Sequence, residues 1–440
     1  MSTTPSGSNY PAAADGMLEF HCSTCGRLLK VPVKAVGKQA RCPQCGAVQL
    51  VPASPPVGAP APAGALPASQ APHTSAADPS FPPAPPPNRP VGSFLPRPQA
   101  APADTGLSLR QALQESSEQH AGRDTPTKRL FDRITAEVAK IFVGQEELVL
   151  GALVALFSSG HVLIESVPGL GKTLFVRTLG RVLGCRFGRI QFTADLMPSD
   201  ITGAPIFDMK IQEFRFRPGP VFTQLLLADE INRSPAKTHA ALLEIMQEYR
   251  VTIDGISHPL DRPFLVLATQ NPLESEGTYN LPEAQIDRFM FKLHADYPLE
   301  QEEANILKLH GGQADINARL EEELATVTSP GEITQVTRDN AQVHIDERLI
   351  DYINKLVRRT RQWPQFHLGA SPRAGIALMQ GARTLAAFSG RDYAVPDDVA
   401  QIVLPALRHR VILTAEAEVE GHKVDDLLTE LVRSVEVPRI

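Results

Sequence analysis

A glycine-rich turn between a short apolar run and a helical segment constrains the fold of this chain more than any other feature. Residues 161–165 read His-Val-Leu-Ile-Glu, which predicts a buried strand, and residues 172–183 have the apolar spacing of a helix. The turn between them reads Ser-Val-Pro-Gly-Leu-Gly and is followed by Lys172 and Thr173. A strand that passes through such a turn directly into a helix is the context of a P-loop, which binds phosphate through backbone N–H groups.

The residues of this turn have separate expected roles. Gly169 and Gly171 let the backbone turn tightly and aim its N–H groups at phosphate oxygens. Lys172 is expected to reach the β- and γ-phosphates of a bound ATP, and the Thr173 hydroxyl is expected to hold Mg²⁺. The common pattern begins with glycine, whereas this chain has Ser166 there. Three neighbours complete the expected nucleotide-binding segment: Pro168, Leu170 and Leu174.

Short apolar runs and helical patterns alternate after this turn. Residues 225–228, 264–268 and 289–293 each predict a further strand. A helix is expected after the first of these runs, with four apolar residues at helical spacing, namely Leu242, Ile245, Met246 and Tyr249. This alternation predicts an α/β fold, a parallel sheet with helices on both faces. Beyond about residue 299 the pattern is helical throughout, which predicts a separate small α-helical domain.

Polar residues follow two of the predicted strands. Asp229 and Glu230 end the run at 225–228, and Asn271 lies in Ala-Thr-Gln-Asn-Pro after the next one. Beside a P-loop, Asp229 is expected to orient Mg²⁺ and Glu230 to polarise the attacking water. Asn271 is placed to hydrogen-bond the γ-phosphate or that water. Taken singly, an Asp-Glu pair is typical of a solvated strand end and an Asn-Pro pair of a turn.

Taken together, residues 125–440 resemble the MoxR group of AAA+ ATPases. The resemblance depends on Val143-Gly144-Gln145, VPGLGKT at 167–173, DEINRSPAK at 229–237, ATQNPLESEGTYNLPEAQIDRF at 268–289 and GASPRA at 369–374. It implies that Asn271 is sensor 1, Arg288 the arginine finger and Arg373 sensor 2. As isolated residues, both arginines would be interpreted as surface ion pairs. It also implies that Val143, Gly144 and Gln145 contact the nucleotide base, that Arg233 lies near a subunit interface, and that the helical domain is a lid.

The resemblance further implies a homo-oligomer, a hexameric ring that hydrolyses ATP and has a chaperone-like role in remodelling client proteins. Adaptors with von Willebrand factor A domains are the implied partners. Family insertions are expected at residues 208–214 and, as a hairpin, at residues 251–256, where Asp254-Gly255 is a tight-turn signal. The alternative hypothesis is a DNA-associated AAA+ regulator or helicase.

Four of the five cysteines form a separate pattern near the N-terminus. Cys22 and Cys25 make one CxxC pair and Cys42 and Cys45 another, each followed by glycine. Four thiolates suit a closed, tetrahedral structural zinc site, and so small a segment needs metal to fold. We therefore expect a zinc ribbon that binds protein or, less favoured, nucleic acid. The fifth cysteine, Cys185, is expected to be a core residue.

Composition sets the remaining expectations. We expect a zinc ribbon at residues 17–52, a flexible Pro/Ala-rich linker at 53–124, an ATPase core at 125–298 and the lid at 299–440. The alternative interpretation of the proline-rich segment is a docking site for a partner. The net charge of −6 gives no reason to expect strong nucleic-acid binding by the whole chain. No apolar run has the length of a membrane helix and no secretory signal is present, so a cytoplasmic protein is expected.

Overall fold

The computed structural model describes residues 17–21, 28–32, 38–45, 48–51, 122–167, 169–210, 212–271, 279, 281–311 and 316–438. The chain divides into two compact units, residues 1–95 and 96–440. Most of the predicted linker, residues 53–121, lies outside the described residues, so its flexibility stays a prediction. The two units are therefore considered separately.

The described residues of the first unit form two antiparallel strand pairs. Strand β1 (Met17–His21) pairs with β2 (Leu28–Pro32), and β3 (Gln39–Arg41) pairs with β4 (Val48–Leu50). Leu29, Cys42 and Val51 are buried together and form a small apolar cluster. Cys22 and Cys25 lie outside the described residues. Within the described part of the chain no three potential metal ligands gather, so the four-cysteine zinc site stays a prediction.

The second unit is built on a parallel sheet of five strands in the order β13-β5-β12-β9-β6. The strands are β5 (Val162–Ser166), β6 (Phe187–Gln191), β9 (Leu225–Asp229), β12 (Leu265–Gln270) and β13 (Phe291–Ala295). This confirms the predicted α/β class and four predicted strands. Strand β6 was not predicted, because it is an edge strand with charged and polar residues and no continuous apolar run.

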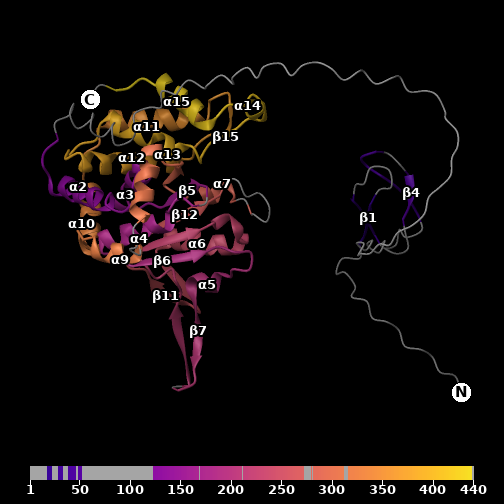
Figure 1. Cartoon of the computed structure of the whole chain (residues 1–440). Helices are drawn as coiled ribbons and strands as arrows, with labels where there is room; N and C mark the ends of the chain where they lie inside the picture. Colours follow the sequence, from indigo (N-terminus) through magenta and orange to yellow (C-terminus); the bar gives the residue numbers. More distant parts are fainter. Residues whose placement is uncertain are drawn as a thin grey trace, which may run out of the picture. The chain divides into compact units, whose positions relative to one another are not determined.

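Helices cover both faces of this sheet (Figure 1). Leu225 and Leu227 face one apolar cluster and Leu226 and Ala228 face the other, because side chains alternate along a strand. Helices α2 (Pro126–Val138), α3 (Glu146–Phe157) and α4 (Lys172–Leu183) pack into the first cluster. Helix α6 (Ala236–Glu248) packs into the second. The continuous apolar character of the strands thus follows from burial on two sides.

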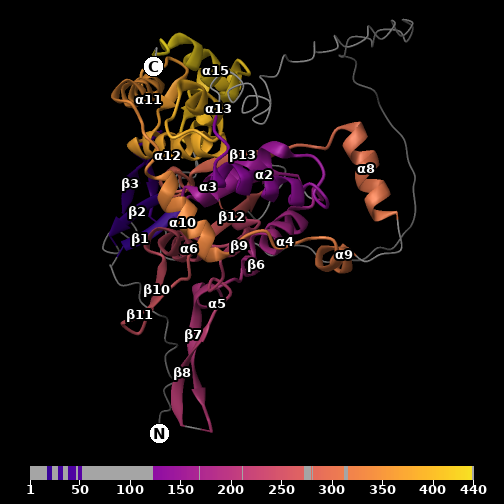
Figure 2. The ribbon, with the colours of Figure 1, turned by 90° about the vertical axis from the view of Figure 1, so that its left-hand side faces the viewer.

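Two hairpins extend from the sheet at the positions of the expected insertions. After α5 (Pro198–Thr202), β7 (Gly203–Asp208) and β8 (Glu213–Pro218) form a long hairpin that projects from the body (Figure 1 and Figure 2). Strands β10 (Arg250–Ile253) and β11 (Ile256–Pro259) form the second hairpin. Asp254 and Gly255 both have positive φ, 50° and 78°, as a two-residue hairpin turn with right-handed strand twist requires.

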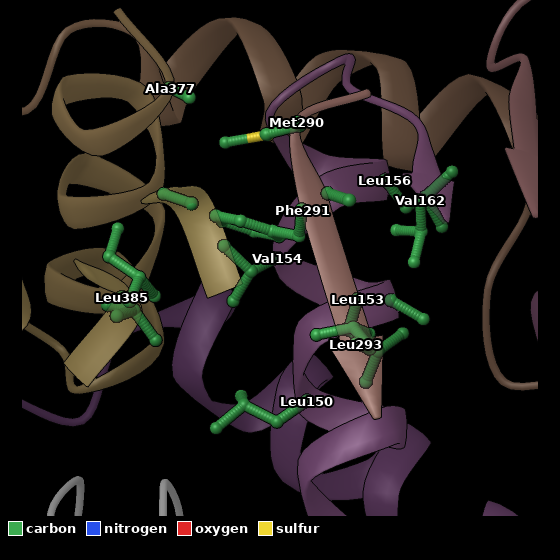
Figure 3. Packing of buried hydrophobic residues seen from close by; sticks show 14 of the residues in the cluster. Leu150, Leu153, Val154, Leu156, Val162, Met290, Phe291, Leu293, Ala377 and Leu385 are labelled. Atoms are coloured by element: carbon green, nitrogen blue, oxygen red, sulfur yellow. The ribbon is translucent and has the colours of Figure 1, made fainter. Parts of the chain in front are cut away.

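The C-terminal part is mainly helical, and its helix α13 (Pro396–Leu407) packs against the edge strand β13. Its elements are α8 (Glu300–His310), α9 (Ile316–Glu322), α10 (Pro330–Asn340), α11 (Glu347–Thr360), β14 (Phe366–Leu368), α12 (Pro372–Phe388), α13 (Pro396–Leu407), β15 (Ile412–Leu413), α14 (Ala415–Val419) and α15 (Val424–Ser434). The short pair β14–β15 departs from the prediction of helix throughout. Figure 3 shows Met290 and Phe291 between α3 and α12. None of the described helices has the length and apolarity needed to span a membrane.

Candidate active site

Three neighbouring strands bring the predicted chemical groups to the carboxyl edge of the sheet. Strand β12 lies between β5 and β9, and all three are parallel. Strand β5 ends at Ser166 before the P-loop, β9 ends at Asp229, and β12 is followed by Asn271, which is 7% exposed. Residues that lie far apart in the sequence therefore meet at one crevice, where ligands of open α/β sheets commonly bind.

The P-loop has the backbone conformation that its glycines were expected to provide. Gly169 has φ 89° and Gly171 has φ 72°, and Gly171 is the N-cap of α4. A Cβ on Gly169 would meet nothing within 4 Å, so glycine is required there by the backbone conformation and not by lack of space. Pro168 lies outside the described residues, while Leu170 and Leu174 pack against the core.

Lys172 lies across this turn. Its Nζ donates to Ser166 Oγ at 2.8 Å and to the Val167 carbonyl at 3.4 Å. The serine that replaces the first glycine of the common pattern is buried and is thus a partner of the lysine. Thr173 occupies the second position of α4, where the N–H groups of the first helical turn are available to an anion.

A threonine on the neighbouring strand fixes the acidic pair. Thr269 Oγ1 donates to Asp229 Oδ1 at 2.7 Å and accepts a hydrogen bond from the Glu230 backbone N–H at 2.8 Å. Arg189 on β6 donates to the other Asp229 oxygen at 2.7 Å. Asp229 is 7% exposed, so these bonds compensate for its burial and fix its orientation.

Glu230 has a strained backbone and an engaged side chain. Its φ of 55° and ψ of 50° lie in the left-handed region, which costs a non-glycine residue on the order of 1 kcal/mol or more. Its Oε2 accepts a hydrogen bond from Gln191 Nε2 at 2.7 Å and pairs with Arg233 at 3.2 Å. Backbone strain of this kind gathers at functional sites, and here it occurs directly after the end of β9.

Phe142, which directly precedes residues 143–145, lies beside the P-loop. The ring of Phe142 packs on Phe175 of α4 at 4.9 Å and lies 3.8 Å from the position of a Cβ on Gly171. Gly144 and Gln145 have positive φ, 77° and 51°. Among the described residues, the buried Gln145 side-chain oxygen has no hydrogen-bond partner. A cavity of ≈ 500 Å³ adjoins this segment, and Phe131, Thr135, Val143, Gly144 and Phe388 are among its lining residues.

These features fit ATP with Mg²⁺. The P-loop backbone and the start of α4 suit phosphate, and the Thr173 hydroxyl with the Asp229 carboxylate supplies the oxygen ligands that Mg²⁺ prefers. The Gln145 side-chain oxygen, which has no partner in the part of the chain that the structure describes, suits the amino group of a purine base, which is a hydrogen-bond donor. The predicted contacts thus come from two segments, because Val143, Gly144 and Gln145 precede α3 and Asp229 ends β9.

The two predicted arginines lie at the opposite edge of the sheet. Arg288 follows the short helix α7 (Glu283–Ile286) and precedes β13, whose first residue pairs with Val162 at the amino end of β5. Because β5 and β13 each have five residues, that end lies on the order of 15 Å from the P-loop. Arg373 is the second residue of α12, and Ser371 before it contacts Asp287 beside Arg288. The structure therefore gathers the two arginines together and separates them from Lys172.

Three residues of the site escaped the sequence analysis, namely Arg189, Gln191 and Thr269. Each lies on a strand that pairs with β9 and hydrogen-bonds Asp229 or Glu230. Gln191 is also the register partner of Asp229. Alternation in Phe-Gly-Arg-Ile-Gln at 187–191 is the only local signal, and it does not specify which strand lies next to β9.

A parallel sheet of this order, with a P-loop and a carboxylate pair at its carboxyl edge and a helical C-terminal part, defines a P-loop ATPase of the AAA+ class. Residues 161–291 match the family model for the "ATPase family associated with various cellular activities (AAA)", and residues 358–431 match the AAA lid domain.

Relatives of known sequence or structure narrow this class. YeaC of Bacillus subtilis (strain 168), itself uncharacterised, is 44% identical over 309 residues, which cover 70% of this chain and 95% of YeaC. The chaperone MoxR1 of Mycobacterium tuberculosis (strain ATCC 25618 / H37Rv) is 42% identical over 319 residues, covering 70% of this chain and 83% of MoxR1. A crystal structure of a candidate ATPase from Cytophaga hutchinsonii ATCC 33406 is 38% identical, with TM-score 0.67, and the match covers 74% of this chain and 99% of that one.

The chain therefore belongs to the MoxR family of AAA+ ATPases. It is an ATPase, and the nucleotide and metal of that reaction are ATP and Mg²⁺.

Proposed function

We propose that this chain assembles into a ring in which ATP hydrolysis drives the remodelling or maturation of partner proteins. The observation that carries the proposal is the separation of Arg288 and Arg373 from the P-loop by the length of the sheet. A site that needs both groups is complete only when a second protomer supplies the arginines. A head-to-tail contact of this kind closes into a ring when its rotation permits, and the family resemblance favours six protomers.

Within such a composite site, each residue of one protomer has a distinct role. Lys172 leaves Ser166 and binds the β- and γ-phosphates, while Thr173 and Asp229 hold Mg²⁺, which neutralises charge on the phosphates when bound. Asn271 orients the γ-phosphate or the attacking water. Glu230 accepts the proton of that water as a general base. In the present arrangement Gln191 and Arg233 both contact Oε2 of Glu230, which holds the carboxylate in place.

The neighbouring protomer contributes positive charge. Arg288 and Arg373 would approach the γ-phosphate from outside the crevice and stabilise the charge on its oxygens during transfer. Neither residue is needed to form the P-loop of its own chain. ATP binding and ATP hydrolysis are therefore expected to depend on different protomers, and this dependence is how a ring couples its subunits.

Protein clients or adaptors are the partners that the surface favours. The hairpin β7–β8 carries exposed apolar side chains, with Met209 83% and Phe214 73% exposed, and exposed apolar groups that gather on one feature commonly mark protein contacts. The relative MoxR1 is named a chaperone. The proposed partners are therefore protein clients and adaptors, including proteins with von Willebrand factor A domains. The DNA-associated alternative has less support, because MoxR1, which is 42% identical, is named a chaperone.

A substrate trap tests the remodelling role. We expect Glu230→Gln protein with ATP to retain specific partner proteins, because it binds ATP and does not turn it over. Lys172→Ala protein is the matched control, since it should not bind ATP and should retain none of them. The measurement is mass spectrometry of proteins that co-purify with each variant, with and without ATP. The same proteins on both variants, or DNA instead of protein on the trap, would contradict the proposal.

We also propose that Cys22, Cys25, Cys42 and Cys45 hold one structural zinc ion. Metal analysis of the purified chain should give about one Zn²⁺ per chain, and Cys42→Ser should lower that content. Cys185→Ser is the control, because burial raises the pKa of the Cys185 thiol to about 12 and so disfavours the thiolate that zinc requires. Removing residues 1–104 should leave ATPase activity intact. A metal-free native protein, or ATPase activity that is lost on truncation, would count against this organisation.

A further inference from the structure

Asp287 connects the two segments that carry the arginines of the proposed composite site. It is the C-cap residue of α7 and directly precedes Arg288. Its carboxylate accepts hydrogen bonds from Ser371 Oγ, at 3.0 Å on Oδ1 and 2.9 Å on Oδ2. Ser371 is the N-cap of α12, and its Oγ accepts from the backbone N–H of Arg373 at 3.2 Å. A continuous chain of hydrogen bonds therefore joins the backbone beside Arg288 to the backbone of Arg373.

A buried arginine of the lid also binds Asp287. Arg410 is 6% exposed, and its Nε donates to Asp287 Oδ1 at 2.8 Å. Its other guanidinium nitrogens donate to backbone carbonyls on both sides of the contact, those of Asp287 at 3.1 Å, Phe289 at 2.6 Å, Met290 at 3.0 Å and Ala406. Arg410, which follows α13, thus connects this part of the lid to the segment that carries Arg288.

Electrostatics give Asp287 a role beyond that of a structural acceptor. Burial lowers the pKa of the Arg410 guanidinium, Asp287 opposes that shift, and the nearby charge of Arg373 adds to it. The Arg410 guanidinium is therefore affected by a carboxylate that stabilises its charge and by a second arginine that repels it. Without the Asp287 charge, the repulsion between Arg410 and Arg373 would no longer be offset.

We propose that Asp287 is a positioning residue that holds Arg288 and Arg373 in one fixed arrangement, so that both reach the nucleotide of the neighbouring protomer together. This inference rests on the proposed function, because it assumes that the two arginines act in trans. Asp287 itself does not contact the reacting atoms. Its effect depends on geometry, and a shift of about 1 Å in a catalytic group can lower turnover on the order of a hundredfold.

The first test is the kinetics of Asp287→Asn, which keeps the shape of the side chain and removes its charge. We expect kcat to fall on the order of a hundredfold while ATP affinity stays unchanged, since the P-loop is untouched. Ser371→Ala should give a smaller loss in the same direction, and it leaves the Arg410–Asp287 pair intact if Asp287→Asn fails to fold. Ser329→Ala is the control, because it removes the N-cap hydroxyl of α10 and should leave kcat unchanged. Equal kcat for Ser371→Ala and Ser329→Ala would overturn the inference.

A mixing experiment separates positioning in trans from a structural defect. Asp287→Asn protein mixed with Lys172→Ala protein should regain activity, because the second variant supplies intact arginines to the intact P-loop of the first. Asp287→Asn mixed with Arg288→Ala should stay inactive, since neither variant supplies both Arg288 and Arg373 in the required arrangement. Recovery in the second mixture and none in the first would show that the defect lies in the variant's own site and would refute the proposal. If Arg288→Ala alone proves fully active, the proposed function fails; if only Asp287→Asn is active, this inference alone fails.

Discussion

Glu230→Gln is expected to bind ATP normally and to lose hydrolysis, whereas Lys172→Ala is expected to lose ATP binding itself. The reason is the geometry of the two side chains. Lys172 lies across the P-loop, where ground-state phosphates bind, and Glu230 lies beyond the end of β9, held by Gln191 and Arg233. A general base commonly contributes between about a hundredfold and ten thousandfold to the rate, so kcat of Glu230→Gln should fall on the order of a thousandfold.

Two measurements separate these effects. Calorimetry or a fluorescent nucleotide gives ATP affinity, and phosphate release gives turnover. Glutamine keeps the length of the side chain and its contact with Gln191, so the protein fold should be unaffected. Glu244→Gln, an exposed position on α6, makes the same change of charge away from the site and should leave both quantities unchanged. Normal turnover by Glu230→Gln, or tight ATP binding by Lys172→Ala, would remove that residue from its assigned role.

Local sequence patterns predicted the parts of this site that local geometry determines. A P-loop is a single strand–turn–helix unit, so the spacing of Gly169, Gly171 and Lys172 was sufficient to place it. The Asp229-Glu230 pair was equally accessible, because it ends a run of buried apolar residues. Strand order β5-β12-β9 then brings the two together, and parallel strands joined by helices made that order reasonable.

The pairing between distant segments could not be predicted from the sequence. Gln191 reaches Glu230 only because β6 lies beside β9 in the observed register, and a shift of one residue would turn it to the other face. Likewise, Ser371 and Asp287 are separated by 84 residues, and only the packing of the lid along β13 places them in contact. Family resemblance identified Arg288 and Arg373 separately, whereas their common position at one edge came from the structure.

Arg288→Ala is expected to bind ATP and to hydrolyse it on the order of a thousandfold more slowly. An arginine finger supplied by a second subunit stabilises transition-state charge, and its removal commonly has an effect of this size. Arg288 precedes β13 at the amino edge of the sheet, so it cannot contribute to the P-loop of its own chain. Arg338→Ala, an exposed position on α10, is the matched control and should retain full activity.

Mixing two inactive variants distinguishes action in trans from action within one chain. Arg288→Ala protein keeps an intact P-loop, and Lys172→Ala protein keeps an intact arginine finger. Where the two meet in the correct order, the interface contains one competent site, so ATPase activity should partly return. Two control mixtures combine each variant with a protein that has the same defect, Arg288→Ala with Arg338→Ala/Arg288→Ala and Lys172→Ala with Arg338→Ala/Lys172→Ala. Neither mixture contains a competent site, so neither should recover activity. Because subunits must exchange for a mixed interface to form, exchange is followed in parallel with labelled protomers. Exchange without recovered activity would show that Arg288 does not act on the neighbouring nucleotide, since the only intact finger in the mixture would then face an intact P-loop without effect.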